Sequence, residues 1–392
     1  MIAQDASILR TILNRRNVAL LRDWTDLEAS LSGLQVPVLL EPYRDNLISY
    51  CRHFQSDTKA NLSLLALLND SILEDLLSKT QVATQYLRIM SSRLATPVLR
   101  SSPKDVLCLK ILTWIHQAHV ETASIPVAFA SGEVAILPMM RALPVYLFPS
   151  LEQNGLLFQS LHFHEFGHGL YVLHKPEMDD LIKELQENIS DILTPLSQRN
   201  DRHAEEAAKE RQAVVGRWYD WAQEIFCDAV GLLIGGPAYL YAFSGYCSNL
   251  SRSDLYLPAE DLARTKHPVT WLRIRLLVRR AEKLGLSAAA SQVRQEWAAL
   301  AGVMQVSEDY HGYYEDAMEE EVYRVISDML AEANPRHFLP EEVDLNPAGE
   351  VQPGVQTMDN PVSLLNRAWH MHNLRPDLYA EWEREAIKVF TK

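Results

Sequence analysis

The chain has 392 residues, of which 47% are hydrophobic and 22% are charged, so it has the composition of a folded protein with a substantial core. Its formal net charge of −14 argues against nucleic acid or an anionic membrane surface as an electrostatic partner. The four cysteines lack C-x-x-C spacing, and the polar N-terminus does not resemble a signal peptide, so we expect a cytoplasmic protein without a disulfide framework.

Residues 1–120 predict a helical N-terminal region. Apolar residues recur every three or four positions, and proline and glycine are sparse. The region contains no motif for a substrate or a partner, so we interpret it as a helical bundle that supports the rest of the chain.

Two short β-prone runs follow, IPVAFASGEVAILP (125–138) and ALPVYLFP (142–149). Proline and glycine bound them, and Ser131-Gly132 is a plausible turn between two strands. The run Val145 to Phe148 lies between prolines, which is typical of an edge strand. The sequence therefore predicts a small sheet.

The stretch LHFHEFGHGLY (161–171) contains the pattern H-E-x-x-H, in which His164 and His168 flank Glu165. A helix is expected over 155–172, and it places both histidines on its apolar stripe, because residues four apart share one helical face. Two histidines and a glutamate are costly to bury together unless a partner compensates them, and Zn²⁺ is such a partner. A pair of histidines bridging a turn without metal is the alternative.

A polar, mixed-charge helical excursion at 175–222 separates this motif from WYDWAQEIFCDAVGLL. Glu224 and Asp228 are four apart in that apolar stretch, so they share a helical face. A catalytic zinc site needs three protein ligands, and Glu224 can be the third. Asp228 can accept a hydrogen bond from the free nitrogen of a ligand histidine. A structural salt bridge to an arginine or lysine is the alternative.

The segment 229–246 is nearly uncharged and approaches the length of a membrane span. Gly235-Gly236-Pro237 interrupts it, so we expect two short buried helices instead. Further on, 338–361 is rich in proline and acidic residues and predicts an extended connection, followed by a C-terminal amphipathic helix.

H-E-x-x-H followed by E-x-x-x-D resembles the gluzincin pattern of zinc metallopeptidases. The long gap between the two motifs is more similar to the prenyl-protein-protease type, and so is the downstream H-P-x4-R-I element, which here is His267-Pro268 followed by Arg273-Ile274. The resemblance covers 125–280, and the same arrangement is familiar from soluble bacterial proteins. The family is often membrane-embedded, whereas this chain has no persuasive transmembrane segment, so the zinc chemistry is carried over but not the prenylated substrate.

The resemblance implies a role for each matching residue. Zinc would be bound by His164, His168 and Glu224, and Glu165 would be the general base. Asp228 would support a ligand histidine, and His267 and Arg273 would be candidates for contacting the transition state. Apart from the resemblance, the mechanism calls for a second donor to the oxyanion, which either His267 or Tyr310 would supply. Without the resemblance, His267-Pro268 is a helix start and Arg273 lies on a solvated helix face.

Together these patterns predict a mainly α (α+β) protein with a zincin-like metallopeptidase core and a small sheet. The expected divisions are a helical N-terminal region at 1–120, the metallopeptidase domain at 121–334 with its insertion at 175–222, and a proline-rich connection with a C-terminal helix at 335–392.

The predicted function is zinc-dependent hydrolysis of peptide bonds, in which Glu165 acts as general base on a zinc-activated water. The partners would be Zn²⁺ and a peptide or protein substrate, with no nucleic acid and no membrane, and the oligomeric state is left open. Two other readings remain: a zinc amidohydrolase of non-peptide substrates, and a non-enzymatic interaction or regulatory protein with a structural or degenerate zinc site.

Overall fold

The chain is mainly helical with one small sheet, as the sequence predicts. The computed structural model describes residues 3–67, 69–137, 142–194, 205–307, 313–343 and 360–392. The chain divides into two compact units. The first comprises residues 1–113, 124–133 and 137–148, and the second comprises 114–123, 134–136 and 149–392.

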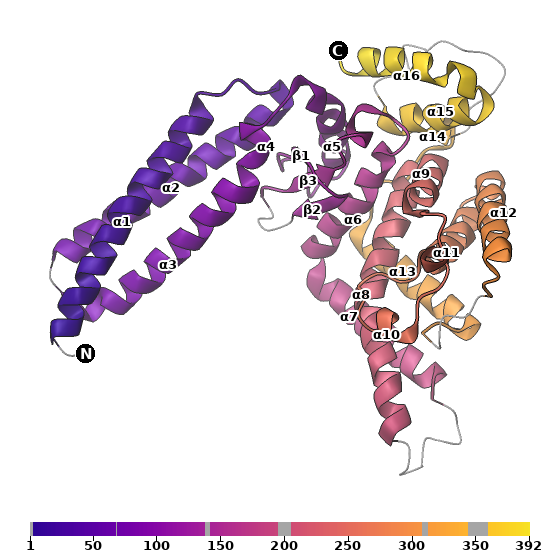
Figure 1. Ribbon diagram of the computed structural model, residues 1–392, viewed down its shortest axis with the longest axis horizontal. Helices are drawn as coiled ribbons and strands as arrows, with labels where there is room; N and C mark the ends of the chain where they lie inside the picture. The colour runs from indigo at the N-terminus through magenta and orange to yellow at the C-terminus, as the bar shows by residue number, and fades with distance from the viewer. Residues whose placement is uncertain (1–2, 68, 138–141, 195–204, 308–312, 344–359) are drawn as a thin grey trace. The chain divides into compact units, whose positions relative to one another are not determined.

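The first unit is built on three long helices that pack against one another (Figure 1). They are α1 (Ala3–Ser32), α2 (Glu41–Ala66) and α3 (Leu73–Ile89). Their apolar stripes form its core, and the buried Asn17 of α1 donates to Thr80 of α3 at 3.0 Å. A π-helical turn at Met90–Leu94 leads into α4 (Thr96–Leu99), and α5 (Val106–Gln117) follows.

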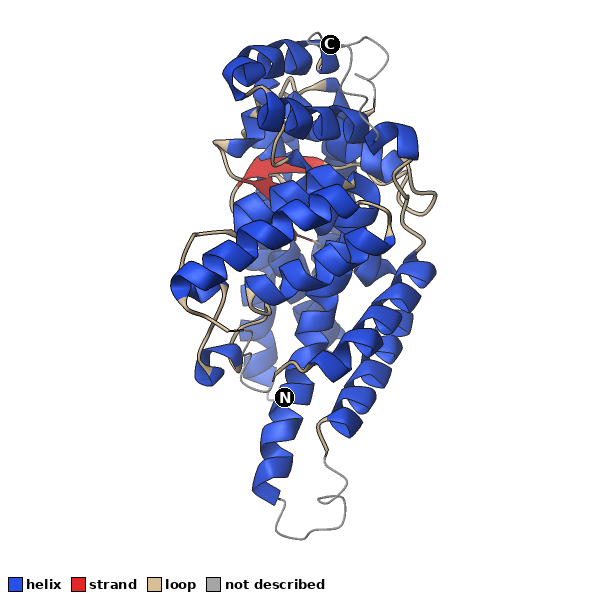
Figure 2. Cartoon of the chain, turned by 90° about the vertical axis from the view of Figure 1, so that its right-hand side faces the viewer, coloured by secondary structure: helices blue, strands red, loops and turns tan. Residues whose placement is uncertain are grey.

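The strands are β1 (Ala128–Ser131), β2 (Ala135–Leu137) and β3 (Val145–Phe148), shown in red in Figure 2. Their order is β1-β3-β2, and β1 runs parallel to β3 with Ala128 opposite Val145. The expectation that β3 is an edge strand is therefore wrong. The prolines on either side lie outside the strand and remove no donor from it, and the carbonyl oxygens of Pro144 and Phe148 both accept bonds from the neighbouring strand region.

The second unit contains the remaining helices. The first four are α6 (His162–Leu173), α7 (Lys175–Ile192), α8 (Glu205–Gly235) and α9 (Pro237–Cys247). The others are α10 (Ala259–Leu262), α11 (Thr270–Lys283), α12 (Ser287–Met304), α13 (Glu319–Ala333), α14 (Pro340–Val343), α15 (Pro361–Leu374) and α16 (Pro376–Phe390). The expected single C-terminal helix is thus two helices, with Pro376 at the start of the second.

The helix with the H-E-x-x-H motif begins later than expected. Gly155 has extended backbone angles (φ −117°, ψ 165°), so the helix cannot include it. A 3-10 turn at Gln159–Leu161 leads directly into α6. The side-chain amide of Gln159 donates from Nε2 to the carbonyl oxygen of Gly155 at 2.9 Å, which stabilises the turn that precedes the helix.

The apolar segment at 229–246 is broken where the sequence predicts. α8 ends at Gly235, Gly236 has a left-handed φ of +60°, and α9 begins at Pro237. Glycine adopts this backbone angle without a steric penalty, and proline at the first helical position costs no hydrogen bond. The first of the two expected short helices is instead the end of the 31-residue α8. Among the described helices, none combines the length and apolarity that a membrane crossing requires.

Candidate metal centre

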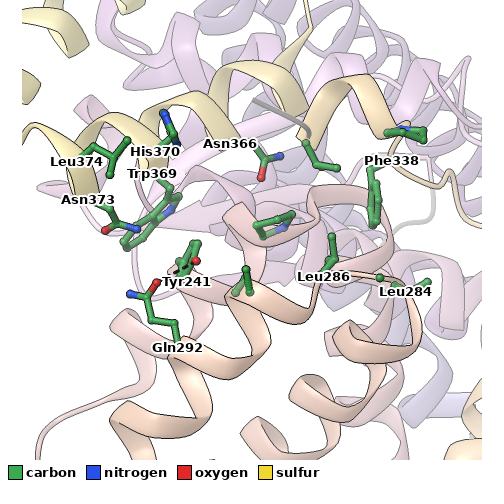
Figure 3. Close-up of a pocket in the computed structure, with 16 residues that line it drawn as sticks. Tyr241, Leu284, Leu286, Gln292, Phe338, Asn366, Trp369, His370, Asn373 and Leu374 are labelled. Atoms are coloured by element: carbon green, nitrogen blue, oxygen red, sulfur yellow. Dashed lines mark hydrogen bonds between the residues drawn. The ribbon is translucent and has the colours of Figure 1, made fainter. Parts of the chain in front are cut away.

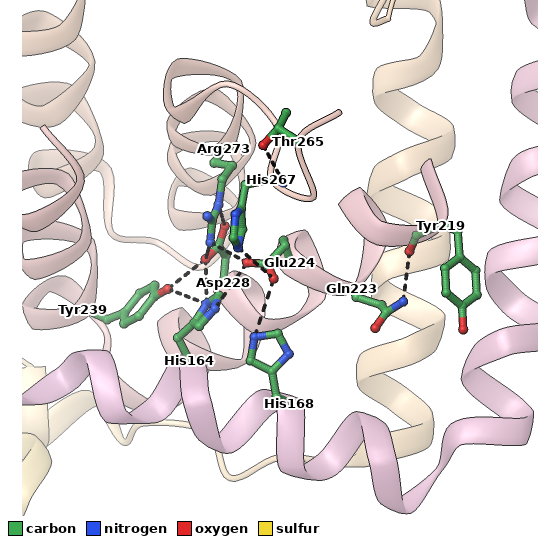
Figure 4. A network of polar contacts seen from close by, with 10 residues as sticks. All are labelled: His164, His168, Tyr219, Gln223, Glu224, Asp228, Tyr239, Thr265, His267 and Arg273. Atoms are coloured by element: carbon green, nitrogen blue, oxygen red, sulfur yellow. Dashed lines mark hydrogen bonds and ion pairs between the residues drawn. The ribbon is translucent and has the colours of Figure 1, made fainter. Parts of the chain in front are cut away.

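Three side chains from α6 and α8 converge on one point (Figure 4). The Nε2 atom of His164 lies 3.5 Å from Oε2 of Glu224, and the Nε2 atom of His168 lies 3.6 Å from Oε1 of the same carboxylate. Each of the predicted zinc ligands therefore has its donor atom directed at the others. The helical spacing of the two histidines and the packing of α6 on α8 produce this arrangement.

Gly167, in the middle of the H-E-x-x-H motif, allows the two helices to come this close. A Cβ atom at Gly167 would lie 2.9 Å from the Cα of Cys227 on α8, which is closer than real Cβ atoms approach other backbone. The absence of a side chain at Gly167 therefore sets the separation of the two histidines from Glu224.

We expect Gly167→Ala to lower the free energy of unfolding by about 1–3 kcal/mol, because the overpacked backbone must move apart. It should also weaken metal binding. Gly169→Ala is the matched control on the same helix, since its Cβ would meet only Ile136 at 3.9 Å. Removing a helical glycine there should be neutral or stabilising. Chemical denaturation of both variants measures the difference, and equal stability of the two would contradict this role of Gly167.

Asp228 holds the other nitrogen of His164. Its Oδ1 lies 2.9 Å from Nδ1 of His164, so Nε2 is left for the point shared with Glu224. Asp228 is buried, and it also accepts hydrogen bonds from Arg273 and from the hydroxyl of Tyr239. The position matches the supporting role expected for Asp228.

Arg273 is buried beside the two carboxylates and does not lie on a solvated helix face, so that alternative is wrong. Its Nε and Nη2 atoms each donate to Asp228 at 2.7 Å, and Nη2 lies 3.3 Å from Glu224. The guanidinium also lies over the ring of Phe243, 4.7 Å from its centroid. These contacts fully engage its charge, and they indicate a group that positions Asp228 and Glu224.

The charges around the site set the protonation of each group. Burial alone would lower the pKa of His164, but hydrogen bonds with Asp228 and Glu224 outweigh it and raise this pKa to about 10. Burial lowers the pKa of His168 to about 4, which keeps its imidazole neutral. Burial opposes the ionisation of Glu224, but hydrogen bonds with His164 and His267 hold its pKa well below the usual range. A metal at His164 would therefore displace a proton.

Glu165 lies beside this point and is buried. Burial raises the pKa of Glu165, the nearby charge of His164 opposes the shift, and the charge of Glu224 adds to it. The backbone N–H of Ile136 in β2 donates to the Glu165 carboxylate and orients it. A buried carboxylate with a raised pKa is suited to taking up and returning a proton.

His267 reaches the site from the loop before α11. Its Nε2 atom lies 3.4 Å from Oε1 of Glu224, and its side chain is 58% exposed. The structure thus brings His267 to the site, in a position from which its side chain can also face solvent. Tyr310 lies outside the described residues.

A cavity of about 630 Å³ opens onto this cluster. It is lined by His164, Glu165, Glu224, His267 and Arg273 together with apolar and neutral polar residues. The volume is in the range of ligand pockets, so a small molecule or part of a peptide can reach the carboxylates and the first histidine.

A second cavity, of about 670 Å³, lies between α9, α12, α14 and α15 (Figure 3). Its walls include Trp369, Phe338 and Leu374, and the ionisable side chains among its lining residues are Tyr241 and His370. Its described lining contains no carboxylate, so the smaller cavity is the candidate site.

Cys227 also lies near the histidines. Ligand atoms of His164, His168 and Cys227 all lie within 4.8 Å of one another, and this group can hold a metal ion. Glu224 is the alternative third ligand: its two oxygens lie 3.5 and 3.6 Å from the Nε2 atoms of the histidines, and it lines the cavity. The thiol of Cys227 is buried between the helices against Gly167.

No sequence pattern predicts the roles of Tyr239, Phe243 and Cys227. Tyr239 and Phe243 lie on α9, in the segment interpreted only as buried helix. The one available signal is the pair Gly231 and Gly235, four apart on α8, which marks a helix face that another side chain can approach closely. Comparison of the chain with protein families, curated proteins and solved structures gave no match.

Proposed function

We propose that this chain is a zinc-dependent metallopeptidase of the gluzincin type with a zincin-like core. One observation carries the proposal: the imidazoles of His164 and His168 meet the carboxylate of Glu224, and His164, Glu224 and a second carboxylate, Glu165, line an open cavity. A site that only stabilised the fold would have no need of a proton acceptor facing the cavity.

The spacing of the donor atoms fits zinc. Zinc binds imidazole nitrogen and carboxylate oxygen at about 2.0–2.2 Å in a tetrahedral arrangement, which puts neighbouring donors roughly 3.3–3.5 Å apart. Oε2 of Glu224 lies 3.5 Å from Nε2 of His164 and Oε1 lies 3.6 Å from Nε2 of His168, so each oxygen is close to this distance from one imidazole. The ligands would be His164, His168 and Glu224.

When bound, zinc would supply a Lewis acid that lowers the pKa of water and polarises the scissile carbonyl group. Glu165 would accept the proton of the attacking water and deliver it to the leaving amine. Asp228 and Arg273 would hold His164 and Glu224 in place, and His267 would reach the developing negative charge from its partly exposed position.

Because β3 is the central strand, it does not offer a free edge to a substrate. We assign the alignment of an extended peptide to β2, which is at the end of the strand order. Val134 precedes β2 and lines the cavity, and Ile136 of β2 contacts Glu165 through its backbone. Peptide recognition by addition to a strand edge uses backbone hydrogen bonds of this kind.

Cys227 favours a second candidate function, a closed structural zinc site in a non-enzymatic protein. If its thiolate joined His164, His168 and Glu224 as a fourth ligand, zinc would be enclosed on the buried side of the cluster. A structural site of this type has no open position for water.

Zinc binding by the wild-type protein and two variants separates the two candidate functions. We expect the wild-type protein to bind one zinc ion, His164→Ala to lose it, and Cys227→Ser to retain it. The proposed function requires the zinc of Cys227→Ser to be bound as tightly as that of the wild type, measured by competition with a chelator. Full zinc occupancy in His164→Ala would contradict both candidates, and loss of zinc in Cys227→Ser would favour the structural site.

A further inference from the structure

The phenol of Tyr239 is completely buried beside the metal centre. Its hydroxyl donates to Oδ1 of Asp228 at 3.0 Å, and it lies 3.5 Å from Nδ1 of His164 (Figure 4). Tyr239 belongs to α9, whereas Asp228 belongs to α8 and His164 to α6. One hydroxyl therefore joins the helix of the first histidine to two others.

We propose that Tyr239 is a positioning residue for the metal centre, and that it acts on His164 through Asp228. The inference rests on the proposed zinc site and adds to it a residue outside both sequence motifs. Two geometric observations support it. Four donors, one of them the Tyr239 hydroxyl, face the carboxylate of Asp228, and α8 leaves space for the ring of Tyr239.

Four donors face the carboxylate of Asp228. Oδ1 accepts from Tyr239 and Arg273 and faces Nδ1 of His164, while Oδ2 accepts from Nε of Arg273. An ionised carboxylate offers about four such positions. Without the Tyr239 hydroxyl, this buried anion loses one of its four donors, and the two bonds from Arg273 are left to hold the carboxylate against His164. The orientation of this imidazole would then be less well defined, which weakens its use as a ligand.

Two glycines on α8 make room for the ring. A Cβ atom at Gly231 would lie 2.4 Å from Cε2 and 2.5 Å from Cζ of Tyr239, and one at Gly235 would lie 2.9 Å from its Cβ. These contacts are so short that any side chain at either position would displace the tyrosine. α8 thus provides both Asp228 and the slot that directs Tyr239 towards it.

The direct test is the zinc dissociation constant of Tyr239→Phe, which removes one hydroxyl and leaves the ring. We expect affinity to fall by about tenfold, the lower end of the effect of supporting residues on metal sites. Tyr241→Phe is the matched control: it lies on the same helix, and its hydroxyl donates to Gln292 at 3.1 Å, away from the cluster. Its zinc affinity should equal that of the wild type.

A second readout separates positioning from a general loss of stability. The visible absorption spectrum of the Co²⁺-substituted protein reports ligand geometry, so it should change in Tyr239→Phe and remain unchanged in Tyr241→Phe. Equal zinc affinity and equal Co²⁺ spectra for Tyr239→Phe and the wild type would overturn the inference and leave the proposed function intact. A wild-type protein that binds no zinc would overturn both.

The space that Gly231 leaves for the Tyr239 ring is tested by comparing the zinc affinity of Gly231→Ala with that of Gly216→Ala. Both are alanine substitutions on α8. The first forces the Tyr239 ring to move, and we expect it to weaken zinc binding at least as much as Tyr239→Phe does. A Cβ at Gly216 would meet nothing within 4 Å, so that variant should bind zinc normally. Unchanged zinc affinity in Gly231→Ala would count against the slot.

Discussion

Glu165→Gln should lower peptide hydrolysis by about 10²–10⁴-fold while the zinc remains bound. Glutamine has the same shape but cannot accept a proton, and Glu165 is not among the three ligands. The assay is cleavage of a mixture of unstructured peptides followed by mass spectrometry, with zinc measured in the same samples. Glu177→Gln, an exposed residue of α7, is the matched control and should be fully active.

Two outcomes would contradict this prediction in different ways. A Glu165→Gln protein with zinc and full activity would remove Glu165 from the mechanism. A wild-type protein that binds zinc but cleaves no peptide would move the proposal towards non-peptide amides, which need the same ligands, or towards the structural site that includes Cys227.

Arg273→Met should lower the free energy of unfolding of the metal-free protein by about 3–5 kcal/mol, the usual cost of removing one partner from a buried ion pair. The substitution leaves the carboxylates of Asp228 and Glu224 without the guanidinium that faces them, and the side chain of Asp228 is only 2% exposed. Urea denaturation after removal of metal measures the effect.

Arg294→Met is the control for this change. Arg294 pairs with Glu282 on the surface, where its side chain is 52% exposed. Exposed ion pairs contribute about 0–1 kcal/mol, so we expect a small change. If Arg273→Met were as stable as Arg294→Met, the buried cluster would not depend on Arg273.

The parts of the site that the sequence predicted are those that follow from helical periodicity. His164 and His168 are four apart, as are Glu224 and Asp228, so each pair shares a helix face before any tertiary structure is known. That the two pairs meet was inferred from the order of the motifs. The structure supplies the physical reason at Gly167, where the helices touch.

The parts that the sequence did not predict depend on contacts between distant segments. In the sequence, Tyr239 is an aromatic residue in an apolar helix, and only the structure shows that its hydroxyl contacts Asp228. β3 is central because of its pairing partners, which the flanking prolines do not reveal. Arg273 has the pattern of a surface arginine, and only the packing of α11 against α8 shows that it is buried.

X-ray absorption at the zinc edge of the wild-type protein, loaded with one equivalent of zinc, tests the central claim most directly. We predict a first shell of nitrogen and oxygen at about 2.0–2.2 Å, with two imidazoles and no sulfur. A sulfur ligand at about 2.3 Å would assign Cys227 to the metal and contradict the open His164, His168 and Glu224 site. A zinc ion without imidazole ligands would contradict the metal centre altogether.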